Sequence, residues 1–168
     1  MSYHGPIIST YHHESAMSEQ WTIGNSWASA TWGTANAAIF IPFKVYHPFT
    51  YQKIFVVNGS AVSGNIDLGI YDSEKHRLGS TGSTAQSGTN AIQSMSLSGT
   101  LLPGWYYFGV ACDNTTATMI RFSSGGPRNK FSHTFTQTSA FALPSTASHS
   151  NYSLTNIPIV GITSRSFL

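Results

Sequence analysis

Three of the six acidic residues of this 168-residue chain lie within eight positions, as Asp67, Asp72 and Glu74. Carboxylates that converge in space can act as general acid and base or bind calcium. Asp67 and Asp72 are five residues apart, so a continuous strand would place them on opposite faces. Asp72 and the serine after it begin a tight turn, where such side chains hydrogen-bond to the backbone. We interpret the cluster as the polar turn of a hairpin, with a loop calcium site of Asp72, Glu74 and Asp113 as the alternative.

Other catalytic and metal-binding patterns fail on single residues. The stretch GNSWA has Ala28 where the nucleophile motif Gly-x-Ser-x-Gly requires glycine. His12 and His13 are adjacent, so on a strand they would point to opposite sides and could not bind one metal together. Cys112 is the one cysteine, which excludes a disulfide framework and a cysteine-based zinc site. The sequence predicts a non-enzymatic protein without cofactor or metal.

The charge content also limits the partners. Charged residues make up 8% of the chain and the formal net charge is +2, whereas about 25% charged residues is usual. The densest basic stretch, residues 121–130, reads RFSSGGPRNK and is typical of a solvated glycine-rich loop, so we expect no nucleic-acid partner. No apolar run is long enough to span a membrane. The first 21 residues lack the pattern of a signal peptide, so we expect a protein made in a cytoplasm.

The aromatic run WYYFGVAC, residues 105–112, alternates with the period of a strand. One face carries Tyr106, Phe108, Val110 and Cys112, and the other carries Trp105 and Tyr107. If the first set faces the core, Trp105 and Tyr107 point outward, beside Tyr71 of another strand. An exposed aromatic patch of this kind indicates a protein interface or a platform for stacking sugars. The alternative is that the N-terminal segment covers this second face.

The elements that would position these side chains are strands. Short β-branched and aromatic segments are separated by Gly, Pro, Ser and Asn, and no segment shows a convincing helical period. Pro42 favours an edge strand or a bulge for its segment. This pattern predicts an all-β protein, with a single β-sandwich or jelly-roll-like domain at residues 35–168. The expected strands lie in residues 37–46, 52–57, 64–71, 78–83, 90–97, 101–113, 116–122, 130–138 and 157–163.

Residues 1–34 have neither period and read as an irregular N-terminal arm. Trp21, Trp27 and Trp32 are spread among small polar residues there. Such a segment lowers its free energy by placing aromatic anchors on another subunit, so we expect a docking arm that orders against a neighbour. The alternative is an arm that folds back over its own sandwich.

The stretches GNIDLGIYDS, GSTAQSGTNAIQSMSL and LLPGWYYFGVACDNTTATMIRF resemble small β-sandwich modules of accessory virion proteins of tailed bacteriophages. The resemblance covers residues 39–122, about half of the chain, and rests on structural motifs. Such hairpins commonly have glycine in the turn, where this chain has Glu74-Lys75-His76. Similar sandwiches also occur in carbohydrate-binding modules and beside secreted peptidases.

The resemblance implies a non-enzymatic particle component, located in the virion after synthesis in the host cytoplasm. A capsid decoration or cement protein would bind its own copies, as a homo-oligomer expected to be a trimer, and the major capsid or another virion protein. The alternative is a tail or fibre receptor-binding module that binds host-surface carbohydrate through exposed aromatic residues. The candidate contact residues are Trp21, Trp27, Trp32, Tyr71, Trp105 and Tyr107.

Overall fold

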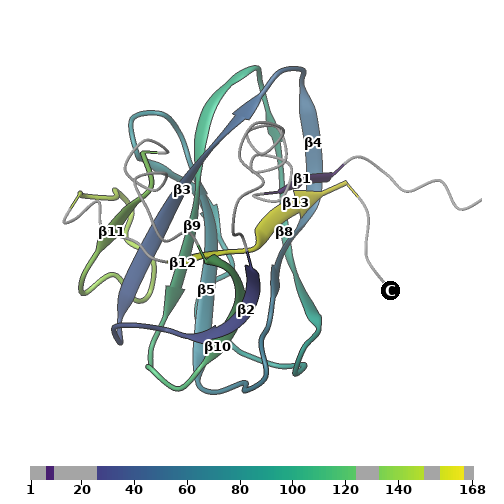
Figure 1. Cartoon of the computed structure of the whole chain (residues 1–168). Helices are drawn as coiled ribbons and strands as arrows, with labels where there is room; N and C mark the ends of the chain where they lie inside the picture. Colours follow the sequence, from purple (N-terminus) through teal and green to yellow (C-terminus); the bar gives the residue numbers. More distant parts are fainter. Residues whose placement is uncertain (1–6, 10–25, 124–132, 150–155, 165–168) are drawn as a thin grey trace, which may run out of the picture.

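A computed structural model describes residues 7–9, 26–123, 133–149 and 156–164 of the chain. These residues form strands and turns without a helix, arranged as a β-sandwich (Figure 1), which confirms the all-β prediction. The strands are β1 (Ile7–Ser9), β2 (Ser26–Thr31), β3 (Ala37–Val45), β4 (Phe49–Val57), β5 (Asn65–Tyr71), β6 (Arg77–Ser80), β7 (Thr84–Ala85), β8 (Ile92–Leu101), β9 (Gly104–Cys112), β10 (Thr118–Ser123), β11 (Phe135–Gln137), β12 (Asn156–Pro158) and β13 (Val160–Thr163).

The strands form two layers. One layer is a sheet with the order β11-β3-β9-β5-β6, in which β7 also pairs with β5. The other consists of two sheets, β1-β13-β4-β8 and β12-β10-β2, which meet at Ile159 between β12 and β13. Ile159 bonds to both sheets, since its N–H donates to the oxygen of Ile120 and its oxygen accepts from Val57. All pairings are antiparallel.

The main hydrophobic core fills the space between the layers. The alternation predicted for residues 105–112 is confirmed, because Phe108, Val110 and Cys112 are buried there and Tyr106 packs against them. Pro42 lies in β3 opposite Tyr107 of β9, whereas β11 pairs only with residues 38–40 of β3. Pro42 therefore occupies a stretch of β3 that has one neighbouring strand, where a missing N–H is tolerated.

A second, smaller core lies on the outer face of the β3-β9-β5 sheet. The segment of residues 134–147, here named the covering segment, packs Phe135, Ala140, Leu143 and Ala147 against this face. It includes β11 and runs across the sheet at the edge of the molecule (Figure 1). The covering segment therefore buries this part of the outer face.

The covering segment is held mainly by hydrogen bonds to the sheet. Asp67 Oδ2 accepts from the N–H of Leu143 at 2.9 Å, and the Tyr71 hydroxyl donates to the oxygen of Pro144 at 2.6 Å. Arg77 donates through Nη1 to the oxygen of Leu143. These contacts explain why a segment with little regular structure stays on the sheet, since buried polar groups stabilise the fold when they are paired.

The hairpin interpretation of residues 64–83 is confirmed, because β5 and β6 pair on either side of the polar turn. The Asp72 oxygen accepts from Lys75 N at 3.0 Å, and Asp72 Oδ1 accepts from His76 N at 2.9 Å. Lys75 has a φ of 71° and so takes the left-handed position that glycine commonly fills. The carboxylate of Asp72 stabilises the turn in place of glycine.

The described residues of the expected N-terminal arm belong to the sandwich. β1 pairs with β13, and β2 pairs with β10 along its whole length. Trp32, directly after β2, is buried in the main core. A domain boundary at residue 34 is therefore wrong for these parts. Residues 10–25 lie outside the described residues.

A network of buried amides joins the loops at one end of the sandwich. Asn58 Nδ2 donates to Gln93 Oε1 at 3.0 Å, and Gln86 Nε2 donates to Asn58 Oδ1 at 2.9 Å. Gln93 Nε2 donates in turn to the oxygen of Ala85 at 2.8 Å. All three amide side chains are buried and mutually paired, so the network fixes the loops between β4, β7 and β8.

Candidate binding surface

Two turns cross side by side between the layers at one end of the sandwich. Residues 46–48 connect β3 to β4, and residues 102–103 connect β8 to β9. The pairs on either side of both turns are Val45 with Gly104 and Phe49 with Leu101. Because both ends of the two turns are in register, the turns must be neighbours. They lie at the upper end of the view in Figure 1.

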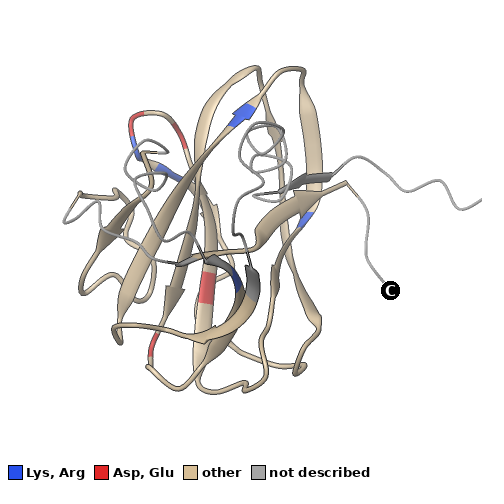
Figure 2. Ribbon diagram, viewed as in Figure 1, with Lys and Arg blue, Asp and Glu red and all other residues tan. Residues whose placement is uncertain are grey.

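Three large apolar side chains are exposed at this end. Tyr46 is 70% exposed, Leu102 is 63% exposed and Trp105 is 50% exposed. The Lys44 Nζ lies 5.1 Å from the centre of the Tyr46 ring and 5.6 Å from that of the Trp105 ring. We name these four residues the aromatic end. Figure 2 shows that the ribbon around this end carries few charged residues.

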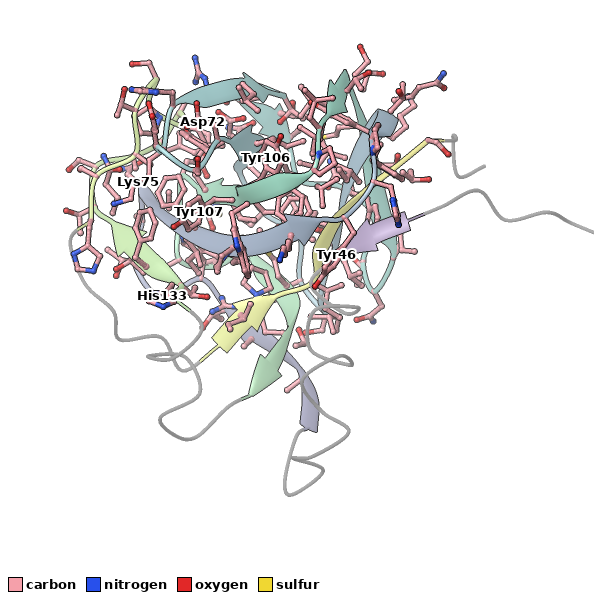
Figure 3. The ribbon with its side chains drawn as sticks, turned by 90° about the horizontal axis from the view of Figure 1, so that it is seen from above. Tyr46, Asp72, Lys75, Tyr106, Tyr107 and His133 are labelled. Atoms are coloured by element: carbon pink, nitrogen blue, oxygen red, sulfur yellow. The ribbon has the colours of Figure 1, made fainter. Side chains whose placement is uncertain are left out.

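Trp105 is exposed because β9 extends beyond its neighbour β5. The β5 ladder ends at the pair of Tyr71 with Tyr107, whereas β3 continues to pair with β9 as far as Gly104. Lys44 lies opposite Trp105 in this extension, on the outer face of the sheet. The covering segment reaches only Tyr107, which is half-buried and meets Phe135 at 5.6 Å between ring centres. In Figure 3, Tyr107 lies between Lys75 and Tyr46.

The expectation that Tyr71 points outward beside Trp105 is only half right. Tyr71 does lie on the outer face, but it is fully buried beneath the covering segment, 5.1 Å edge-to-face from Phe40. Burial raises the pKa of the Tyr71 phenol, so its hydroxyl remains a hydrogen-bond donor to Pro144. Tyr71 is therefore a core residue and is not available to a partner.

The three tryptophans of the expected arm have different outcomes. Trp32 is 2% exposed, and its Nε1 donates to the oxygen of Ala37 at 3.2 Å. The guanidinium carbon of Arg121 lies 5.2 Å from the centre of the Trp32 ring, and burial lowers the Arg121 pKa to about 10. Trp32 is thus a core residue rather than a contact residue. Trp27 is in β2 with its side chain outside the described part, and Trp21 lies outside the described residues.

The acids do not form the calcium site considered above. Asp113 bonds to Asn65 at the start of β5, whereas Asp72 follows the end of that strand, roughly 20 Å away for a strand of this length. Asp72 and Glu74 instead lie 3.6 and 3.7 Å from His76 Nδ1. Across the described ranges, no group of three or more His, Cys, Asp or Glu side chains could hold a metal ion.

The environments of Asp67 and Asp113 shift their pKa values in opposite directions. Burial raises the pKa of Asp67, which outweighs the lowering by its hydrogen bonds to Leu143 and Thr81. Desolvation also acts to raise the pKa of Asp113, but hydrogen bonds from Asn65 and Asn114 lower it overall. Both carboxylates have structural partners, so neither is positioned for acid–base chemistry on a substrate.

Sequence reasoning identified Trp105 but missed Tyr46, Leu102 and Lys44. The sequence does mark Tyr46 and Leu102 as turn residues. Tyr46 lies two residues before Pro48 in the segment YHP, and Leu102 lies directly before Pro103 in the segment LLPG. Apolar residues in such turns are exposed when the turns connect two layers. The sequence did not reveal that the two turns are neighbours.

No protein-family model matches the chain, and a search of curated proteins finds no match to it. In the part of the chain that the structure describes, no helix is long and apolar enough to cross a membrane.

Proposed function

We propose that this chain is a non-enzymatic structural protein of a bacteriophage particle, a capsid decoration or cement protein. It is made in the host cytoplasm and then docks through the aromatic end onto the major capsid protein or another virion protein. The observation that carries the docking proposal is the exposure of Tyr46, Leu102 and Trp105 side by side. The resemblance to phage sandwich modules supports the virion part.

The composition of the aromatic end suits a protein interface. Interface centres are rich in Trp and Tyr and poor in charged residues, and a few such anchors carry most of the binding energy. The Lys44 ammonium lies near both rings, so cation–π attraction offsets part of the cost of covering its charge. Self-association, with three copies by resemblance, and docking by residues before Ser26 stay predictions.

The test uses particles assembled without this protein, to which the purified full chain is added before sedimentation. Trp105→Ala should weaken particle binding by roughly 30-fold or more, as expected for a tryptophan hot spot. The matched control is Leu78→Ala, because Leu78 is 51% exposed on β6. Equal binding of the wild type, Trp105→Ala and Tyr46→Ala would contradict docking at this surface.

A second candidate is recognition of host-surface carbohydrate by a tail-associated receptor-binding module. The observation that favours it is the half-exposed Trp105 ring beside the Lys44 ammonium. An indole face can stack on the apolar side of a sugar ring while a nearby donor bonds to hydroxyl or carboxylate oxygens.

A glycan array separates the two candidates. Binding that Trp105→Ala abolishes and Leu78→Ala preserves would favour the receptor-binding function. An array without signal, together with particle binding, would favour decoration.

A further inference from the structure

Strand β8 is an open edge of its sheet. It is the last strand in the order β1-β13-β4-β8, and it is ten residues long. Asn58 N donates to the oxygen of Ala91 at 2.9 Å, so Ala91 and alternate residues after it face β4. The peptide groups of Ile92, Ser94 and Ser96 then point away from β4, and within the described residues they have no strand beside them.

This edge has little protection against strand addition. Natural edge strands are blocked by lysine, proline, charge or a bulge. The chain has no charged residue or histidine from Leu78 to Cys112, and β8 has no proline. The one irregularity in its pairing with β4 is a register shift in the C-terminal half of β8, between the pairs Tyr51–Gly99 and Lys53–Ser96. The stretch from Ile92 to Ser96 remains regular.

We propose that β8 pairs antiparallel with β8 of a second copy of this chain, about a two-fold axis at Ser94. Ser94 is the midpoint of the regular stretch, and in this register Ile92 lies opposite Ser96 of the second copy. The residues whose peptide groups face the edge then pair with one another, which gives about six new backbone hydrogen bonds. The pairing is independent of the proposed docking function, because it leaves the aromatic end free.

A second copy fits this edge for electrostatic reasons. In a two-fold pair the residue on the axis meets its own copy, and any charged side chain near the axis would lie close to its own copy, so a charged edge would repel itself. In the described sheet β1-β13-β4-β8 the one charged residue is Lys53 on β4, which donates to Ser96 Oγ at 2.9 Å. Its counterpart would be about three strand spacings away, roughly 14 Å, which exceeds the screening length of about 8 Å at physiological salt.

One exposed side chain near the axis also gains from the pairing. Ile92 is 52% exposed in the single chain and would be partly covered. The two four-stranded sheets would become one continuous sheet. The expected oligomer is a dimer, in contrast to the trimer that the resemblance implies.

The test is sedimentation of the full chain from about 1 to 100 µM, a range in which weak specific pairs dissociate. The wild type should change from monomer to dimer. Ser94→Pro removes an N–H that β4 does not use, and it should raise the dimer dissociation constant by roughly tenfold or more. Ser94→Lys, which places like charges face to face, should have the same effect. Thr100→Lys, on β8 beyond the register shift, should leave the dimer unchanged.

Amide hydrogen exchange gives a second readout that needs no variant. The amides of Ile92, Ser94 and Ser96 should exchange quickly at low protein concentration and become protected at high concentration. The inference is overturned if the chain stays monomeric throughout, if these amides never gain protection, or if Trp105→Ala rather than the Ser94 variants abolishes the dimer. In the last case the aromatic end is the self-association surface.

Discussion

Replacing the buried Asp67 by asparagine should stabilise the protein at neutral pH, whereas alanine should destabilise it. Asp67 is 0% exposed, and its carboxylate accepts from Leu143 N at 2.9 Å and from Thr81 Oγ1 at 3.2 Å. Asparagine keeps an oxygen for Leu143 and offers its amide N–H to the threonine oxygen, and it removes a buried charge. Alanine leaves the N–H of Leu143 without an acceptor under the covering segment.

The sign of the pH dependence follows from the raised pKa of Asp67. The folded state binds the Asp67 proton more tightly than the unfolded state, so this group favours folding fully below its unfolded pKa of about 3.9. That contribution is lost as the pH rises through the folded value. Each unit by which the folded pKa exceeds the unfolded one is worth about 1.4 kcal/mol at neutral pH. The advantage of Asp67→Asn should therefore be largest at pH 7–8, a range set by ordinary carboxyl titration, and shrink on acidification.

The assay is thermal unfolding followed by circular dichroism between about pH 4 and pH 8, the range over which carboxyl groups titrate. An unsatisfied buried N–H costs about 1–3 kcal/mol, so Asp67→Ala should lower Tm by roughly 2–12 °C for a chain of this size. Asp113→Asn is the opposite control. The pKa of Asp113 is lowered, so its contribution to stability is present above its unfolded pKa and lost in acid. The reasoning is refuted if Asp67→Asn destabilises at pH 7 as much as alanine does.

Three further predictions concern the buried amide network, Trp32 of the main core and the N-terminal boundary of the domain. Asn58→Ala should lower the unfolding free energy in urea by about 2–4 kcal/mol, because the buried Gln86 amide nitrogen loses one of its two acceptors and the buried Gln93 oxygen loses one of its two donors. Trp32→Ala should cost about 3–5 kcal/mol in the same assay and expose the Arg121 guanidinium, and a loss under 1 kcal/mol would contradict its core position. Limited proteolysis should leave a stable fragment that begins at or before Ser26, and a fragment that begins at Ala35 would contradict the pairing of β2.

Period and turn chemistry predicted the parts of the fold that are locally determined. The faces of residues 105–112 were assigned correctly because each residue alternates on an unbroken strand. The hairpin at Asp72 was assigned correctly because the aspartate forms its bonds within five residues. Trp32 was misassigned, since its small polar neighbours show no period. Its ring packs in the main core and under Arg121, which is distant in sequence.

The covering segment could not be predicted from the sequence for a related reason. Residues 134–147 have no sustained alternation, and the segment is fixed by Asp67, Tyr71 and Arg77 of the β5–β6 hairpin. Hydrogen bonds between a side chain and a distant backbone group have no sequence signature. Asp67 and Tyr71 thus read as outward-facing polar and aromatic residues, and the structure shows that they hold the cover over the outer face.

The same contacts explain why the aromatic end is open. The side chains that hold the covering segment come from β5 and the hairpin after it, its β11 pairs with β3 only at residues 38–40, and β5 ends opposite Tyr107. Beyond that point the described part of the sheet consists of β3 and β9, and no described side chain of β5 lies there to hold a cover over Lys44 and Trp105. The exposure of Trp105 is therefore a consequence of unequal strand lengths. Lengthening the β5 hairpin would be expected to bury this surface, and a binding function located there requires β5 to stay short.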